Sequence, residues 1–305
     1  MAWAGGAGGA PSGSAPDPQG TREVAILVYH RFAETAEDSM TVRTQTFEAQ
    51  LRFLREHGYQ FVPLRDVVAW LRAQREEADG ADANAPASAA ASASANVAAD
   101  VAASAPAGAR TSARTSAPVT LPLKAVALTV DDGHHSVYDV MLPIVQREHL
   151  PVTLFVYPSA VSNAPYALTW NQLRTLHDTG LFDVQSHTWW HPNFNVERRR
   201  QAPEEFRRFV LTQFRHSRER IEAEVGTDVD MLAWPFGVYD EELMTLAREA
   251  GYQAAFTLEA HKVTPRARML AMPRFLMVDA CTPAVLARLL GETVTPAVPS
   301  GESAR

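Results

Sequence analysis

The sequence is poor in three features that would each point to a particular class of protein. It contains one cysteine, Cys281, which excludes an internal disulfide and a cysteine-rich structural zinc site. No apolar run reaches the roughly 20 residues that a membrane-spanning helix needs. Acidic residues outnumber basic residues, and the resulting net charge of −7 argues against nucleic acid or another polyanion as a partner. The remaining composition, 46% hydrophobic over 305 residues, is sufficient for one large core.

Three segments lack the large apolar side chains that a core requires. Residues 1–20 are rich in Gly, Ala, Pro and Ser, without the basic start and apolar centre of an intact signal peptide, and we expect them to be disordered. Residues 78–118 are mostly Ala and Ser with interspersed prolines, which predicts an unstructured insertion. Residues 291–305 are expected to be a flexible tail. The predicted domain therefore covers 21–290, interrupted by the insertion at 78–118.

Within this domain, short β-rich runs alternate with helical patterns. Such alternation predicts an α/β protein with a parallel sheet, either a β/α barrel or a doubly wound open sheet. Thr44 or Thr46 is expected to cap the first helix, and Gly58 to end it. Strands are predicted at 23–29, 60–64, 125–130, 152–156, 183–186, 231–234, 254–258 and 275–278. Helices are predicted after residue 46 and at 66–75, 137–148, 171–179, 204–224, 240–250 and 283–290.

Two adjacent carboxylates follow the strand predicted at 125–130. Asp131 and Asp132 lie where this strand ends, and Gly133 lets the chain turn away. Like charges this close repel each other unless a cation or hydrogen bonds compensate them, so the pair is a candidate metal site. A surface turn of the Asp-Asp-Gly type is the alternative.

Two histidines follow the strand predicted at 183–186. His187 and His191 are four residues apart, so one turn of backbone can present both imidazoles to the same point. An aspartate with two histidines is a typical ligand set for a catalytic divalent ion, because it leaves positions for water and substrate. A β/α barrel gathers its reactive residues at the carboxyl ends of its strands, which is where these motifs lie.

These motifs resemble those of polysaccharide deacetylases of the NodB-homology type, carbohydrate esterase family 4. The first family motif, T-F-D-D-G, corresponds to residues 129–133, with Val130 in place of Phe. The second, H-[ST]-x-x-H, corresponds to residues 187–191. The third, R-x-P-x-G, corresponds to residues 233–237, with Ala233 in place of Arg. The resemblance implies a distorted (β/α)7 barrel.

Three further stretches narrow the resemblance within the family. They are Trp-Pro-Phe-Gly at 234–237, Phe-Thr-Leu-Glu at 256–259 and Met-Pro-Arg at 272–274. These stretches are most similar to the enzymes that de-N-acetylate poly-β-1,6-N-acetylglucosamine of biofilm matrix. The similarity therefore suggests an exopolysaccharide of this kind as the substrate.

The resemblance also implies roles for the two carboxylates and the two histidines. Asp132, His187 and His191 are expected to hold one divalent ion, zinc in the first instance, with nickel or cobalt as alternatives. Asp131 is expected to be the general base that takes a proton from water. The ion would polarise the amide carbonyl and make the water more acidic.

The third motif supplies the expected oxyanion donor. The backbone N–H of Phe236 is the candidate, because Pro235 has no N–H and Gly237 permits close approach. In the family the motif arginine holds the base carboxylate, and Ala233 cannot do so. Arg274 is a candidate substitute, and an ordinary surface arginine is the alternative reading of that residue.

Other residues are predicted for proton transfer and for substrate binding. His261, near the position of the family's fifth motif, is a candidate acid for the leaving amine, and an exposed loop histidine is the alternative. His30, after the first strand, is expected to orient Asp131 or Asp132. The candidates for sugar contact, for which packing is the alternative role, are Trp189, Trp190, Trp234, Pro235 and Phe236.

The leading hypothesis is a metal-dependent hydrolase that removes N-acetyl groups from the amino sugars of a polysaccharide. Alternatives with the same chemistry act on chitin oligomers, on peptidoglycan or on a formylated aminosugar lipid. A carbohydrate-binding protein with weak or lost activity is the alternative from another class, because the motif arginine and a clear acid are missing. The resemblance implies a periplasmic or secreted protein, and the sequence leaves the oligomeric state open.

Overall fold

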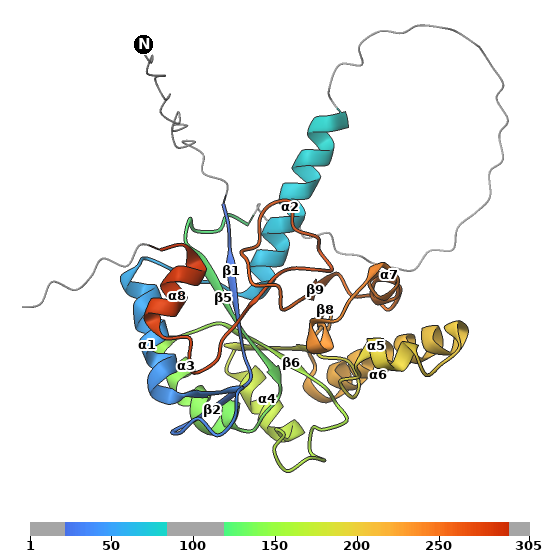
Figure 1. Cartoon of the computed structure of the whole chain (residues 1–305), viewed down its shortest axis with the longest axis horizontal. Helices are drawn as coiled ribbons and strands as arrows, with labels where there is room; N and C mark the ends of the chain where they lie inside the picture. Colours follow the sequence, from blue (N-terminus) through green and yellow to red (C-terminus); the bar gives the residue numbers. More distant parts are fainter. Residues whose placement is uncertain (1–21, 84–118, 293–305) are drawn as a thin grey trace, which may run out of the picture.

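The computed structural model describes residues 22–83 and 119–292 (Figure 1). Its strands are β1 (Ala25–Tyr29), β2 (Arg31–Ala33), β3 (Thr41–Arg43), β4 (Gln60–Phe61), β5 (Ala125–Asp132), β6 (Val152–Val156), β7 (Phe182–Ser186), β8 (Met231–Ala233), β9 (Ala254–Phe256) and β10 (Phe275–Leu276). Its α-helices are α1 (Thr44–Glu56), α2 (Leu64–Ala83), α3 (Leu142–Glu148), α4 (Trp170–Asp178), α5 (Phe194–Arg198), α6 (Pro203–Val225), α7 (Glu241–Glu249) and α8 (Pro283–Leu290). The π-helical turn η1 (Val137–Met141) and the 3₁₀ turn η2 (Pro235–Gly237) complete the set.

A sheet of eight parallel strands is the centre of the fold. Its order is β10-β1-β5-β6-β7-β8-β9, with β4 paired to the start of β5. Met272 bridges to Phe256 of β9, and three residues later Phe275 of β10 pairs with Leu27 of β1. The segment that contains Met272 and Phe275 thus joins the two edges of the sheet. The sheet is curled, and the expected distorted β/α barrel is confirmed.

Side chains along β5 alternate between two apolar clusters. Val126, Leu128 and Val130 belong to the outer cluster, which the surrounding helices cover. Ala125 and Ala127 belong to the inner cluster. This period of two is the normal consequence of strand geometry, and it fixes which face each later residue of β5 presents.

Helix α2 fills the end of the barrel where the strands begin. Its Val67, Trp70 and Leu71 are buried in the inner cluster beside Ala127. Figure 1 shows α2 rising from this end of the sheet, while α1, α8, α4 and α6 lie around the outside. The carboxyl ends of the strands are therefore the end of the barrel at which polar residues can face the interior.

Most predicted elements are present with small shifts at their ends, and three predictions about helices and strands need correction. Helix α2 continues to Ala83, so the start of the predicted insertion is helical, in keeping with the high helix propensity of alanine. Strand β4 ends at Phe61 rather than residue 64. Helix α1 begins at Thr44 without a threonine cap, because the Thr46 hydroxyl donates to Asp279 instead.

The sequence did not predict β2, β3 or α5, each of which spans three to five residues. The predicted tail begins too early, since the carboxylate of Glu292 accepts hydrogen bonds from Tyr59 and Lys124. The predictions for residues 1–20, for 84–118 and for 293–305 lie outside the described residues. None of the helices in the two described ranges has a stretch long and apolar enough to cross a bilayer.

Candidate active site

The two carboxylates at the end of β5 reach the barrel interior by different means. Asp131 is on the inward face of β5, two residues after Thr129 and four after Ala127. Asp132 would point outward by the same alternation, but its backbone has φ of +73°. This turn of the backbone brings the Asp132 carboxylate to the same side as His187, whose Nε2 lies 3.7 Å from Asp132 Oδ1.

Asp132, His187 and His191 converge on one point. One ligand atom from each lies within 4.8 Å of the others. Nε2 of His187 and Nε2 of His191 are 3.7 and 3.8 Å from the same Asp132 oxygen. One carboxylate and two imidazoles around a common space are a ligand set for a divalent cation.

The orientation of His187 favours this use. Its Nδ1 lies 2.8 Å from the backbone carbonyl of Ala233. A carbonyl only accepts, so Nδ1 carries a proton, and Nε2 is the nitrogen that faces Asp132. Burial is the main cause that lowers the pKa of His191 to about 4, so His191 is neutral near pH 7. The Nε2 atoms of both imidazoles thus face the Asp132 carboxylate, and Nε2 is a nitrogen through which histidine binds metal ions.

Asp131 is bound by Arg274. The guanidinium donates from Nη1 to Oδ1 at 2.8 Å and from Nη2 to Oδ2 at 2.7 Å. Both side chains are buried, at 2% and 0% exposure. Burial alone would raise the pKa of Asp131, but the Arg274 guanidinium outweighs that effect and holds the pKa at about 2. Asp131 is therefore an anion that Arg274 orients.

Arg274 is itself fixed by two threonines, one in β5 and one directly after β9. Its Nη1 donates to Thr129 Oγ1 and its Nε to the carbonyl of Thr257, both at 3.1 Å. The Thr129 hydroxyl donates in turn to the Leu27 carbonyl at 3.0 Å. Four of the five N–H donors of a guanidinium are engaged in these contacts and those to Asp131, so the side chain has one orientation.

The turn η2 places Phe236 beside the ligand set. Its ring lies 4.5 Å from that of His191, and the residue is 57% exposed. Its backbone has φ of +57°, and its N–H donates to no carbonyl outside its own turn among the described residues. Thr188 and His191 also have positive φ, of +68° and +62°. Backbone of this kind clusters at functional sites, where the surrounding structure holds it in place.

The structure divides the predicted sugar contacts into exposed and buried residues. Trp190 is 42% exposed, and Trp189 is half-buried. Trp234 is 1% exposed and donates from its ring to the Leu270 carbonyl, so it cannot stack on a sugar. Pro235 is buried as well. The prediction of sugar contact is therefore wrong for Trp234 and is not supported for Pro235.

Neither predicted histidine makes the contact expected of it. His261 is on an exposed loop, where its ring contacts Glu259 and Lys262 rather than the carboxylate pair. His30 makes no hydrogen bond to Asp131 or Asp132 among the described residues, and its Nδ1 is shielded from solvent without a partner. Burial lowers the pKa of His30, while the charges of the two aspartates oppose that shift. His30 is thus close to the carboxylate pair but free to bind something else.

Two tyrosines that the sequence analysis did not single out complete the surroundings of His191. The ring of Tyr157 lies 5.5 Å from that of His191, and its hydroxyl is 2.7 Å from the hydroxyl of Tyr166. Tyr157 directly follows β6, which pairs with β5 and β7 in the sheet. Tyr157 could have been predicted as a site residue from the sequence, because it comes directly after a barrel strand.

Comparisons with known proteins agree with this geometry. The Polysaccharide deacetylase family model matches residues 119–255. A poly-β-1,6-N-acetyl-D-glucosamine N-deacetylase of Staphylococcus epidermidis is 24% identical over 160 residues, which are 51% of this chain and 55% of that protein. The chain thus spans about half the length of the curated relatives that it matches.

Two solved structures share the fold over most of the chain. IcaB from Ammonifex degensii aligns with a TM-score of 0.65 and 20% identity, covering 88% of this chain and 97% of that chain. The Streptococcus pyogenes deacetylase PplD, in complex with acetate, aligns with a TM-score of 0.64 and 20% identity, covering 88% and 99%.

Proposed function

We propose that the chain, whose residues 119–255 match the Polysaccharide deacetylase family model, is a metal-dependent hydrolase that removes N-acetyl groups from the amino sugars of a polysaccharide. The convergence of Asp132, His187 and His191 beside the Asp131–Arg274 pair carries the proposal. The substrate that we propose is a poly-β-1,6-N-acetylglucosamine-like exopolysaccharide, which is the polymer in the names of relatives at 21–24% identity.

Asp132, His187 and His191 would hold the divalent ion, with zinc as the first candidate. The mixed carboxylate and imidazole set suits zinc, nickel or cobalt better than magnesium or calcium, which prefer oxygen ligands alone. When bound, the ion would polarise the acetyl carbonyl and increase the acidity of a water molecule. The remaining steps belong to residues of the chain.

Asp131 is the proposed general base. Its carboxylate is ionised and lies 3.8 Å from His187 Nε2, so it is next to the proposed ion without being needed as a ligand. Arg274 makes Asp131 a weaker base but holds both of its carboxylate oxygens in one orientation. Because the attacking water is made more acidic by the ion, a well-placed weak base is sufficient to take its proton.

Two further groups are proposed for the later part of the reaction. The Phe236 N–H would donate to the oxyanion that forms when water adds to the acetyl carbonyl. We assign the proton donor for the leaving amine to His30 rather than His261, because the unpartnered Nδ1 of His30 is buried near the carboxylate pair and His261 is exposed on a loop. Burial lowers the pKa of His30, so the proton that it donates would be the one that Asp131 takes from water. Trp190 and the Phe236 ring are the exposed aromatic surfaces available to a sugar.

Acetate release from N-acetylglucosamine oligomers tests the function. The β-1,6 oligomer should release acetate faster than β-1,4 oligomers or peptidoglycan, and a formylated aminosugar lipid should release little formate. Dialysis against a chelator should abolish the reaction, and added zinc should restore it. If metal-loaded protein binds the oligomers but releases no acetate from any of them, it is a carbohydrate-binding protein and the proposal is wrong. We also propose that it acts outside the cytoplasm, where such matrix polymers accumulate.

A further inference from the structure

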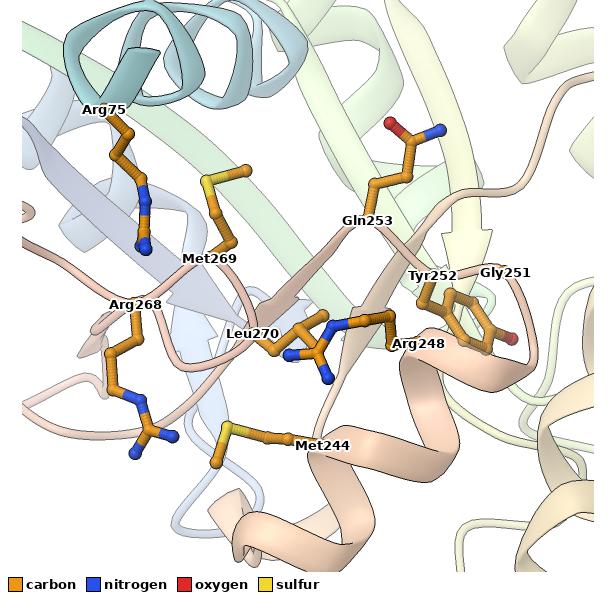
Figure 2. Close-up of a pocket in the computed structure, with 9 residues that line it drawn as sticks. All are labelled: Arg75, Met244, Arg248, Gly251, Tyr252, Gln253, Arg268, Met269 and Leu270. Carbon is orange, nitrogen blue, oxygen red and sulfur yellow. The ribbon is translucent and has the colours of Figure 1, made fainter. Parts of the chain in front are cut away.

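One hollow of the molecule is separate from the Asp and His site. It is a cavity of about 650 Å³ between α2, the end of α7 and the segment 268–270 (Figure 2). Gln253, in its wall, directly precedes β9, whereas the ligand set follows the carboxyl ends of β5 and β7. No residue that lines this hollow belongs to the proposed catalytic machinery. The volume lies within the range of small-molecule pockets in proteins, about 300–1,000 Å³.

Three arginines from three different segments surround this hollow. Arg75 extends from α2, Arg248 from α7 and Arg268 from the segment after residue 267, as Figure 2 shows. Among the residues that the structure describes, no acidic side chain lines the hollow. Arg75 and Arg248 have no ion pair with a carboxylate among the described residues, whereas Arg268 pairs with both oxygens of the exposed Glu241, at 2.6 and 2.8 Å.

This group of cations is unusual for the molecule as a whole. The chain has a net charge of −7, and other arginines of the molecule, such as Arg207 and Arg215 of α6, pair with a glutamate. Glu241 compensates Arg268 alone, so Arg75 and Arg248 bring uncompensated positive charge to this space, which an anion there would offset. The electrostatics of the pocket therefore favour a ligand with negative charge.

The floor of the pocket is apolar. Met244 and Leu270 are buried, and Met269 is half-buried beside them. Such a surface binds the apolar face of a ring better than it binds a bare, hydrated ion. The guanidinium forks above it match the planar oxygens of a carboxylate or the oxygens of a phosphate.

We propose that this pocket binds a small ring compound that carries a phosphate monoester or a carboxylate. Arg75, Arg248 and Arg268 bind the anionic group, and the floor of Met244, Met269 and Leu270 contacts the ring. The ligand is a small molecule rather than a polyanion, because the negative charge of the rest of the protein repels a long acidic chain. This site is independent of the proposed deacetylation, since it shares no residue with it.

Calorimetric titration of the full chain tests the pocket. The probes are glucose 6-phosphate, glucuronate, inorganic phosphate and glucose. At least one of the two ring-borne anions should bind saturably, more tightly than inorganic phosphate, and glucose should not bind. The double variant Arg75→Gln/Arg248→Gln should weaken that binding by at least about tenfold, because two charge-assisted contacts are lost. The control, Arg208→Gln, replaces an exposed arginine of α6 and should stay within about twofold of wild type.

The titrations distinguish a phosphate ligand from a carboxylate ligand, and some of their outcomes would overturn the proposal. Preference for glucose 6-phosphate identifies a phosphate ligand, and preference for glucuronate identifies a carboxylate ligand. If neither binds saturably up to about 10 mM, well above the usual range for metabolites, the proposal is overturned. It is also overturned if the double variant, shown by circular dichroism to be folded, binds as wild type does. Equal binding of inorganic phosphate would mean an adventitious ion only. Because no turnover is measured, failure here leaves the proposed deacetylase activity unaffected.

Discussion

Arg274 binds both oxygens of Asp131, at 2.8 and 2.7 Å, across 143 positions of the sequence. The family motif has an arginine where this chain has Ala233, at the end of β8. Arg274 reaches the same kind of carboxylate from the segment just before β10. The proposed base Asp131 thus has a guanidinium partner, although the uncharged Ala233 stands at the motif position.

Arg274→Gln should lower both stability and turnover. Asp131 would remain as a buried charge without a partner, which destabilises a protein by about 3–5 kcal/mol. Arg274→Lys keeps the charge without the two-pronged geometry and should fall between wild type and Arg274→Gln. Urea unfolding and acetate release measure the two effects, with Arg208→Gln as the surface control. Wild-type turnover in folded Arg274→Gln would show that Arg274 does not position the base.

His187→Ala should lose the metal ion. The variant removes one of three ligands and the imidazole that Ala233 orients, so less than one equivalent of zinc should remain after gel filtration. His261→Ala, on its exposed loop, should keep the wild-type content. Elemental analysis of both purified variants makes the comparison. Equal zinc in His187→Ala and wild type contradicts the proposed ligand set.

Replacement of Asp131 should impair turnover, whereas replacement of Asp132 should impair metal binding. Asp131→Asn should keep the metal and lose turnover by about 10²–10⁴-fold, the usual contribution of a general base. Asp132→Asn should bind the metal more weakly, and excess zinc should restore part of its activity. Metal titrations read beside acetate-release rates decide the roles. The roles are reversed if Asp131→Asn loses the metal and Asp132→Asn retains it.

His30→Ala should slow amide cleavage more than ester cleavage. An amine must be protonated to leave, whereas an aryloxide leaves readily without a proton, so loss of the proton donor affects the amide selectively. We expect a fall of about 10²-fold or more in acetate release from the sugar amide and a small change with an aryl acetate. His261→Ala should match wild type with both substrates. A parallel fall in both rates for His30→Ala would indicate a structural role instead.

Asp279 should make stability depend on acidic pH. Its Oδ1 accepts hydrogen bonds from the Arg43 backbone and from Thr46, at 3.0 and 2.7 Å. Burial alone would raise the pKa of Asp279, but these hydrogen bonds and the Arg43 guanidinium lower it. A carboxyl whose pKa is lower in the folded than in the unfolded chain contributes stability above the unfolded-state pKa and loses it as the pH falls through the folded-state pKa.

Wild type should therefore lose more unfolding free energy than Asp279→Asn between about pH 5 and pH 2. Urea unfolding across that range gives the comparison. Glu219→Gln, an exposed change on α6, should follow the wild-type curve. Parallel curves for wild type and Asp279→Asn would mean that the carboxylate does not stabilise the start of α1.

The sequence was sufficient to predict the residues whose positions follow from their spacing within a short motif. Asp132, His187 and His191 were predicted from motifs, and the strands that carry them follow from their apolar, β-branched runs. The burial of Trp234 could also have been predicted from the sequence. Ala233 faces the barrel interior, so the next side chain along the strand must point outward into the helices.

Contacts between distant segments could not be predicted with the same certainty. The sequence offered Arg274 only as a candidate, because nothing local shows which buried carboxylate a guanidinium 143 positions away will meet. His30 and His261 illustrate the same limit, since both follow predicted strands and only the closed sheet shows which one faces the carboxylate pair. The extension of α2 to Ala83 depended on choosing between alanine's helix propensity and the low complexity of the segment.

The left-handed backbone of Asp132, His191 and Phe236 has a consequence for protein engineering. Each of these residues would be replaced with less conformational strain by glycine, by about 1 kcal/mol. A search for thermostable variants that scores heat resistance alone would therefore favour glycine at two proposed metal ligands and at the proposed oxyanion turn. Variants of this chain selected for stability need a catalytic screen in the same round, because the easiest stabilising changes lie where the chemistry is proposed.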